Sequence, residues 1–151
     1  MIDLRELYQD VILDHSKHPR NFGALAGCSH EARGNNPLCG DRVTVHLALD
    51  DGRIADVRFE AKGCAISVAS ASMMTELVKG RTVAEAEAVF ERFHEIVTRK
   101  GEVGADEIES LDKLAALIGV RQFPMRVKCA TLPWHTMRAA LARSGEEVTT
   151  E

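Results

Sequence analysis

The chain has 151 residues, of which 45% are hydrophobic and 28% are charged, as in ordinary globular domains. Its formal net charge of −4 provides no basic excess, which argues against nucleic acids and anionic membranes as partners. There is no apolar run of the roughly 20 residues that a bilayer-spanning helix needs, and the first residues lack the pattern of a secretory signal. We therefore expect one cytoplasmic domain over residues 1–151.

Cysteines are the residues that most restrict the possible functions. The chain contains Cys28, Cys39, Cys64 and Cys129. Because cytosolic thiols are kept reduced, we do not expect disulfides among them. Their spacing also differs from the paired CxxC motifs of zinc fingers and thioredoxin-like sites. Spacing alone leaves two interpretations open, namely metal or sulfur chemistry and buried, inert thiols.

The first predicted element is an amphipathic helix over residues 3–15, where apolar residues recur at helical spacing. It should end before Pro19, because the residue preceding a proline avoids the helical conformation. His15 and His18 lie at this end, where positive charge suits the helix dipole. We therefore expect these histidines to form a helix cap and a solvated turn rather than to bind metal.

An irregular segment punctuated by glycines follows over residues 22–34, with one short strand near residues 30–33. Cys28 lies in this segment and has no partner nearby in the sequence. We interpret Cys28 as structural or incidental.

Two runs of alternating apolar and polar residues predict an antiparallel hairpin. They cover residues 43–49 and 55–61 and are joined by Asp51-Gly52, a strong hairpin-turn pair. One face of this hairpin should be buried. His46 lies on the polar face, and we expect it to be exposed.

Helices should make up most of the remaining chain. They are predicted over residues 65–79, from the capping box Thr82–Glu85 to about residue 100, over residues 108–119, and from about Leu132 to Arg143. Small residues in the first of these predict close packing on the sheet, with Met73 and Met74 in the core. Pro133 is tolerated in the first turn of the last helix, and the polar tail over residues 144–151 should be frayed.

A candidate metal site combines residues from distant parts of the chain. Cys39 and Asp41 share a predicted loop, whereas Cys64 and Cys129 each precede a predicted helix, where the dipole favours thiolate. Three sulfurs and one carboxylate form a set that zinc accepts in tetrahedral geometry, and thiolates also bind iron–sulfur clusters. Because a carboxylate binds soft metals less well than a fourth cysteine would, we expect an exchangeable site.

Two cations flank the last cysteine of this set. We interpret Lys128 as surface charge. Arg126 has two interpretations, which the sequence leaves open. It is either surface charge as well, or a residue that pairs with Asp41 or lowers the pKa of a thiol.

Three motifs together resemble the SufU-type branch of the U-type (IscU-like, NifU N-terminal) iron–sulfur assembly proteins. They are Asn35-Asn36-Pro37-Leu38-Cys39-Gly40-Asp41, Gly63-Cys64-Ala65-Ile66-Ser67 and Arg126-Val127-Lys128-Cys129-Ala130-Thr131-Leu132. Residues 8–15 and 19–21 are similar to that family too, so the resemblance covers nearly the whole chain. The scaffold branch usually has histidine at the position of Lys128, and a shorter interval without the sequence around residues 81–104. Both differences favour the SufU-type branch.

The resemblance implies an α+β fold, in which helices cover one face of a small antiparallel sheet of about three strands. It also implies zinc bound by Cys39, Asp41, Cys64 and Cys129. Cys39 would accept persulfide sulfur from a SufS-like, pyridoxal-phosphate-dependent cysteine desulfurase and serve downstream iron–sulfur assembly proteins. Arg126 matches an arginine near the site and is a candidate catalytic residue, whereas Cys28 matches nothing.

The leading hypothesis is therefore a zinc-dependent sulfurtransferase, although the sequence leaves open whether the protein is an enzyme in the strict sense. The alternative is a scaffold on which an iron–sulfur cluster is built transiently and then transferred. A purely structural zinc module is disfavoured, because the apolar stripes already supply a core, whereas small zinc modules fold only with metal.

Overall fold

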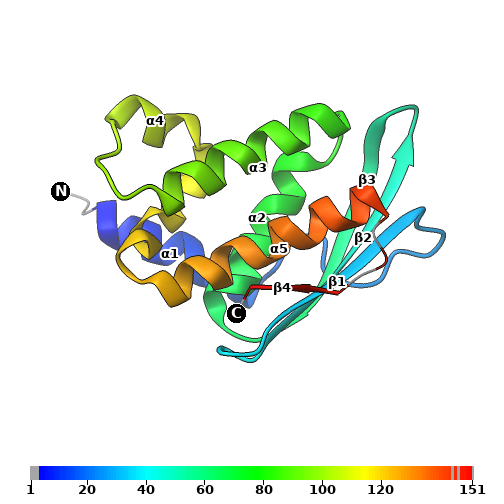
Figure 1. Cartoon of the computed structure of the whole chain (residues 1–151), viewed down its shortest axis with the longest axis horizontal. Helices are drawn as coiled ribbons and strands as arrows, with labels where there is room; N and C mark the ends of the chain where they lie inside the picture. The colour runs from blue at the N-terminus through cyan, green and yellow to red at the C-terminus, as the bar shows by residue number, and fades with distance from the viewer. Residues whose placement is uncertain (1–3, 144, 146, 151) are drawn as a thin grey trace.

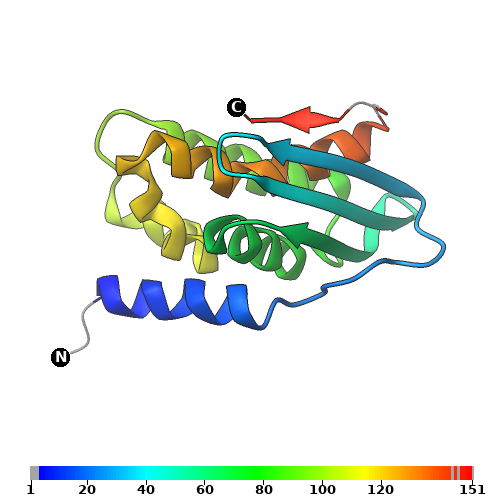
Figure 2. The same cartoon turned by 90° about the horizontal axis from the view of Figure 1, so that it is seen from below.

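Helices cover one face of a four-stranded sheet in the computed structural model (Figures 1 and 2). The structure describes the backbone of residues 4–143, 145 and 147–150, and within these ranges it describes the side chains of residue 6 and later residues. The strands are β1 (His30–Asn36), β2 (Asp41–Asp50), β3 (Arg53–Lys62) and β4 (Val148–Thr149). Their order is β3-β2-β1-β4, and only the β1–β4 pair is parallel. The expected α+β class is confirmed.

The sheet has one strand more than the expected three or so, because part of the C-terminal tail pairs with β1. Val148 and Thr149 are in register with Gly34 and Asn35, and Thr150 donates its backbone N–H to the Asn35 carbonyl at 3.2 Å. The prediction of a frayed tail is therefore wrong for residues 148–150. The β1 edge supplies backbone partners that the tail sequence does not reveal.

The hairpin of β2 and β3 forms as predicted. Asp51 and Gly52 both have positive φ, as a two-residue hairpin turn requires. Val45 pairs with Phe59 and Leu47 with Val57, and all four side chains are fully buried. The sheet therefore contributes one apolar face to the core.

The predicted N-terminal helix and the first helix after the hairpin pack against each other. They are α1 (Leu4–Lys17) and α2 (Ala65–Val78), and α2 also contacts α5 and β3. Met73 and Met74 are fully buried, as expected for core residues. Three serines of α2 are buried as well, which allows the close packing that the small residues predicted.

His15 is buried, so the prediction that it forms a helix cap is wrong, whereas His18 is exposed, as expected for a solvated turn. His15 is only 4% exposed, and its Nδ1 lies 2.7 Å from the Oγ of Ser72 in α2. Burial lowers the pKa of His15, which favours the neutral ring. The histidine therefore joins two helices instead of interacting with a helix dipole.

Between residues 83 and 122, one of the two predicted helices is confirmed and the other is divided. α3 (Val83–Thr98) begins with the expected capping box, but the predicted helix over residues 108–119 is divided into α4 (Ala105–Ser110) and a 3₁₀ segment, η1 (Asp112–Gln122). Asp112 has a φ of 54°, a left-handed conformation that interrupts an α-helix. Helical periodicity alone does not show this break.

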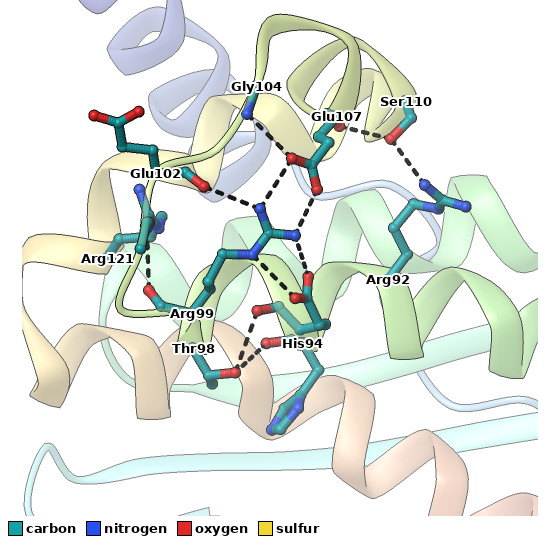
Figure 3. Close-up of polar contacts among 11 residues, drawn as sticks. Arg92, His94, Thr98, Arg99, Glu102, Gly104, Glu107, Ser110 and Arg121 are labelled. Atoms are coloured by element: carbon teal, nitrogen blue, oxygen red, sulfur yellow. Dashed lines mark hydrogen bonds and ion pairs between the residues drawn. The ribbon is translucent and has the colours of Figure 1, made fainter.

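Arg99 fixes the connection between α3 and α4 (Figure 3). Its guanidinium donates hydrogen bonds to the carboxylates of Glu95 at 2.7 Å and of Glu107 at 2.5 Å. The hydrogen bond from Arg99 lowers the pKa of Glu107 to about 2. Arg121 of η1 donates to the backbone carbonyls of Arg99 and Gly101. These contacts order the segment that the sequence identified as extra relative to the scaffold branch.

The last helix begins earlier than predicted. α5 runs from Pro124 to Ala142, so Pro124 occupies the first turn and Pro133 lies inside the helix. The prediction assigned Pro133 to the first turn because proline is tolerated there. α5 packs on β1, β2 and α2. Burial in these contacts stabilises a helix that an interior proline otherwise weakens.

The buried apolar side chains form one core between the sheet and the helices. Its largest fully buried members include Trp134, Phe59, Phe90, Phe93, Met73 and Met74. Among the residues that the structure describes, no helix is long and apolar enough to cross a membrane.

Candidate functional site

A tight connection between β1 and β2 carries the first cysteine of the candidate site. Asn36 ends β1 and is in register with Asp41, the first residue of β2, so the loop contains only residues 37–40. The sequence placed Asp41 in the loop, and that assignment is wrong. Gly40 has a φ of +72°, which suits the turn. Cys39 is therefore on a short loop, and Asp41 is anchored in the sheet.

Asn36 organises this loop, a role that sequence analysis missed. Its side chain is fully buried, its Oδ1 accepts the Leu38 N–H at 3.3 Å, and its backbone carbonyl accepts the Cys39 N–H at 3.2 Å. Its Nδ2 lies 3.6 Å from the Sγ of Cys129. One asparagine thus connects the loop to the last cysteine. An asparagine directly before a proline-containing turn was the available sequence signal.

Asp41 is held by the segment that carries the next cysteine. Its carboxylate is 1% exposed, and Oδ1 accepts the backbone N–H of Cys64 at 2.8 Å. Oδ2 lies 3.6 Å from the Cys64 Sγ. Gly63 has a φ of +149°, and a Cβ on it would lie 2.8 Å from the Asp41 Cα. Only glycine allows this close approach.

The structure brings the four expected ligand residues together. Cys64 is the N-cap of α2, as predicted, whereas Cys129 lies inside α5 and not before it. The ligand atoms of Cys39, Asp41 and Cys129 lie within 4.8 Å of one another, and Cys64 adjoins Asp41 at 3.6 Å. These residues come from a loop, a strand and two helices, so the site forms only when distant segments of the chain pack together.

Cys64 and Cys129 do not gain the thiolate character that the helix dipole predicted. Burial raises the pKa of Cys64, and the amide of Ser67 opposes it only in part. Burial raises the pKa of Cys129 still further, together with hydrogen bonds to Asp41 and Cys39. Burial and the neighbouring acceptors therefore outweigh the dipole.

The donor set fits a tetrahedral metal ion. Zinc–sulfur bonds of about 2.3 Å at tetrahedral angles place sulfur atoms roughly 3.8 Å apart, so donors within 4.8 Å need only small movements. A divalent cation would also compensate the negative charge of the thiolates and the Asp41 carboxylate, which are poorly solvated in this partly buried site. Cys39, Asp41, Cys64 and Cys129 can thus hold such an ion.

Arg126 and Lys128, the two cations that flank Cys129, lie in different surroundings. Arg126 is exposed, with its Cζ 5.3 Å from the centroid of the Phe123 ring, so this structure shows it on the surface and not paired with Asp41. Lys128 lines a cavity of about 840 Å³ together with His94 and His135. A catalytic role for Arg126 therefore stays a prediction.

His46 is placed differently from what the sequence predicted, and it lies beside Cys28. His46 is 7% exposed, so the expectation of an exposed histidine is wrong. Its Nδ1 lies 3.9 Å from the Sγ of Cys28, which therefore has a neighbour that sequence spacing did not reveal.

Comparison with known proteins supports the assignment that the motifs indicated. The sequence model of the NifU-like N terminal domain matches residues 7–130, a range that includes all four expected ligand residues. The chain belongs to this family. The resemblance to U-type proteins is thereby confirmed.

Relatives within the family carry two kinds of name. The zinc-dependent sulfurtransferase SufU of Bacillus subtilis is 42% identical over 141 residues, which cover 93% of each chain. The iron–sulfur cluster assembly scaffold protein IscU of Streptococcus pyogenes is 40% identical, covering 93% of this chain and 86% of that protein. The crystal structure of a protein of Fervidobacterium islandicum, named as an iron–sulfur cluster assembly scaffold protein for the SUF system (FiSufU), has a TM-score of 0.80 at 34% identity, covering 92% of this chain and 99% of that one.

Proposed function

We propose that this NifU-like protein is a zinc-dependent sulfurtransferase that accepts persulfide sulfur from a cysteine desulfurase for iron–sulfur cluster assembly. The observation that carries the proposal is the unequal attachment of the convergent ligands. Cys39 lies on a four-residue loop, whereas Asp41, Cys64 and Cys129 belong to a strand and two helix segments. One thiol can therefore move while three ligands stay in place.

Zinc would be held by Cys39, Asp41, Cys64 and Cys129, and when bound it would stabilise the thiolate forms that burial disfavours. Asp41 is pre-oriented for this role, because its Oδ1 is occupied by the Cys64 amide and its Oδ2 faces the sulfur atoms. Because Asp41 supplies a carboxylate in place of a fourth thiolate, the ligand set has a lower affinity for soft metals. We expect this difference to make exchange of Cys39 possible.

The sulfur transfer is a thiol–disulfide type of exchange. The Cys39 thiolate attacks the outer sulfur of the desulfurase persulfide, a new S–S bond forms on Cys39, and the desulfurase thiolate leaves. Cys39 is half-buried, and Leu38 beside it is 58% exposed, so the loop is open to a partner protein. Phe123, the N-cap of α5, and Met125, in its first turn, are 52% and 50% exposed. These apolar side chains are candidates for contact with the partner.

A scaffold function is the second candidate, favoured by the relatives named IscU and by the ability of thiolates to bind clusters. The residue before the third cysteine argues against it. Lys128 lines a separate cavity, and its side chain has no ring nitrogen that could serve as a ligand as a histidine at this position would. Metal analysis of protein purified without added metal distinguishes the two, because zinc without visible absorption supports the first and iron with visible absorption the second.

The decisive experiment compares Cys39→Ser with Cys64→Ser and Cys129→Ser, three identical substitutions at sites of different mobility. Cys39→Ser should abolish desulfurase stimulation and the persulfide mass on the protein while retaining part of its zinc, because the three ligands fixed in the strand and the two helix segments remain. The other two variants should lose zinc more completely. A Cys39→Ser protein that still stimulates the desulfurase and still gains a persulfide would show that another cysteine is the acceptor.

A further inference from the structure

A second cluster of potential ligands surrounds His46 on the face of the sheet that the helices do not cover. His46 lies between Val45 and Leu47 in β2, and because those two side chains are buried in the core, His46 points to the opposite face. It is nevertheless nine-tenths buried. Glu31 of β1 is directly opposite in the register, and Cys28 lies in the segment before β1.

The two ring nitrogens of His46 have different surroundings. Nε2 lies 3.0 Å from Oε1 of Glu60, which is the distance of a good hydrogen bond. Nδ1 lies 3.9 Å from the Cys28 Sγ and 4.0 Å from the Glu31 Oε1. Within the part of the chain that the structure describes, Nδ1 has no closer polar partner. A buried nitrogen thus faces a thiol and a carboxylate across a small gap.

This gap has the size of a metal site. The donor atoms of Cys28, Glu31 and His46 all lie within 4.8 Å of one another. Bond lengths of about 2.0–2.3 Å at tetrahedral angles require donor separations of roughly 3.4–3.6 Å for nitrogen with oxygen or sulfur. The observed distances from Nδ1 exceed this by only a few tenths of an ångström. Small side-chain movements would therefore close the site.

The contact of Nε2 with Glu60 is the second feature typical of a metal-binding histidine. Ligating histidines usually donate their other ring N–H to a carboxylate, which fixes the tautomer and leaves the opposite lone pair for the metal. Glu60 occupies that position for His46. A simple buried hydrogen bond explains Nε2, whereas Nδ1 has only long contacts, at 3.9 Å to the Cys28 Sγ and 4.0 Å to the Glu31 Oε1.

We propose that Cys28, Glu31 and His46 bind a divalent cation of the zinc type, with Glu60 orienting the histidine and water completing the coordination. Mixed sulfur, nitrogen and oxygen donors suit zinc, and cobalt can replace it as a spectroscopic probe. Arg58 is opposite His46 in the register, which places a positively charged residue on the same face of the sheet as the site. The site is consequently weaker than the first one, and its ion would join the segment around Cys28 to β1 and β2. None of this depends on sulfur transfer.

The test uses the full-length, reduced and metal-stripped protein. Titration with Zn²⁺, read by native mass spectrometry, should give two ions per wild-type chain and one in Cys28→Ser and His46→Gln. His18→Gln, at an exposed histidine, is the matched control and should keep two. Cobalt titration of Cys28→Ser should show loss of the thiolate–cobalt absorption that belongs to the second equivalent.

Alkylation with iodoacetamide, read at the Cys28 peptide, reports the site directly. Excess Zn²⁺ should slow modification of Cys28 about tenfold or more in wild type but not in His46→Gln. Thermal melting followed by circular dichroism shows whether His46→Gln is folded, and Glu31→Gln, at an exposed residue, provides a second variant that should lose the second ion. Equal stoichiometry in wild type and Cys28→Ser would overturn the proposal, whereas one ion in wild type and none in Cys28→Ser would show that the first site, not this one, is empty. Unchanged Cys28 alkylation with zinc would also overturn the proposal.

Discussion

Replacement of Gly63 by alanine should disturb the candidate metal site without removing a ligand. The added methyl group would lie 2.8 Å from the Asp41 Cα and in conflict with the Asp41 side chain. Asp41 begins β2 and accepts a hydrogen bond from the Cys64 amide, so its displacement changes two ligands at once. We therefore expect both the stability of the protein and its zinc affinity to fall.

The magnitude follows from two contributions. Gly63 has a φ of +149°, and alanine in a glycine-only conformation costs about 1–3 kcal/mol. Displacing Asp41 in a packed environment adds about 1–3 kcal/mol. Gly23→Ala is the matched control, because Gly23 has a φ of +126° and nothing within 4 Å of the added methyl. The control should show only the first contribution.

Thermal unfolding of the metal-free proteins measures the difference. At about 2–4 °C per kcal/mol for a domain of this size, Gly63→Ala should melt about 2–12 °C below Gly23→Ala. Competition with a chromophoric chelator should show about 10–100-fold weaker zinc binding for Gly63→Ala and little change for the control. Equal melting temperatures and equal zinc affinities of the two variants would refute the argument that Gly63 positions Asp41.

Three further measurements test the core and its charges. Removal of metal should preserve most of the helical circular dichroism, because the hydrophobic core is independent of the thiols, and a random-coil spectrum would contradict this. Ser70→Ala should lower the free energy of unfolding by about 2–3 kcal/mol, since its hydroxyl donates to a buried α5 carbonyl at 2.5 Å and accepts from the Trp134 indole at 3.1 Å. Ser67→Ala should lower the free energy of unfolding by less than about 1 kcal/mol, because the buried Ser67 Oγ has no hydrogen-bond partner in the described part of the chain. Equal losses for Ser67→Ala and Ser70→Ala in urea titrations would exclude this explanation. Burial lowers the pKa of His135 from 6.5 to about 4, so the unfolded chain protonates first as the pH falls. Because the ring is only partly buried, solvent screening limits the stability lost between about pH 6.5 and 4 to about 1–2 kcal/mol. His135→Gln should flatten the stability profile in that window relative to His18→Gln, and parallel profiles would show that His135 is not responsible.

Features that depend on a few neighbouring residues could be predicted from the sequence. The alternation of β2 and β3 with the Asp51-Gly52 turn, and the capping box that begins α3, depend on local backbone geometry. The position of Cys64 at a helix start is local in the same sense. The resemblance of the three cysteine motifs to U-type proteins supplied the ligand set, which local pattern alone left open.

Other features were decided only by contacts between distant segments. Helix α5 begins at Pro124 because packing on the sheet supports a helix that includes Pro133. His46 is buried by side chains from three segments, which a polar position in an alternating strand does not reveal. The close approach of Gly63 to Asp41 likewise exists only when α2 and β2 meet. Sequence periodicity determines which face of an element is apolar, whereas the burial of a polar group depends on what the rest of the chain places over it.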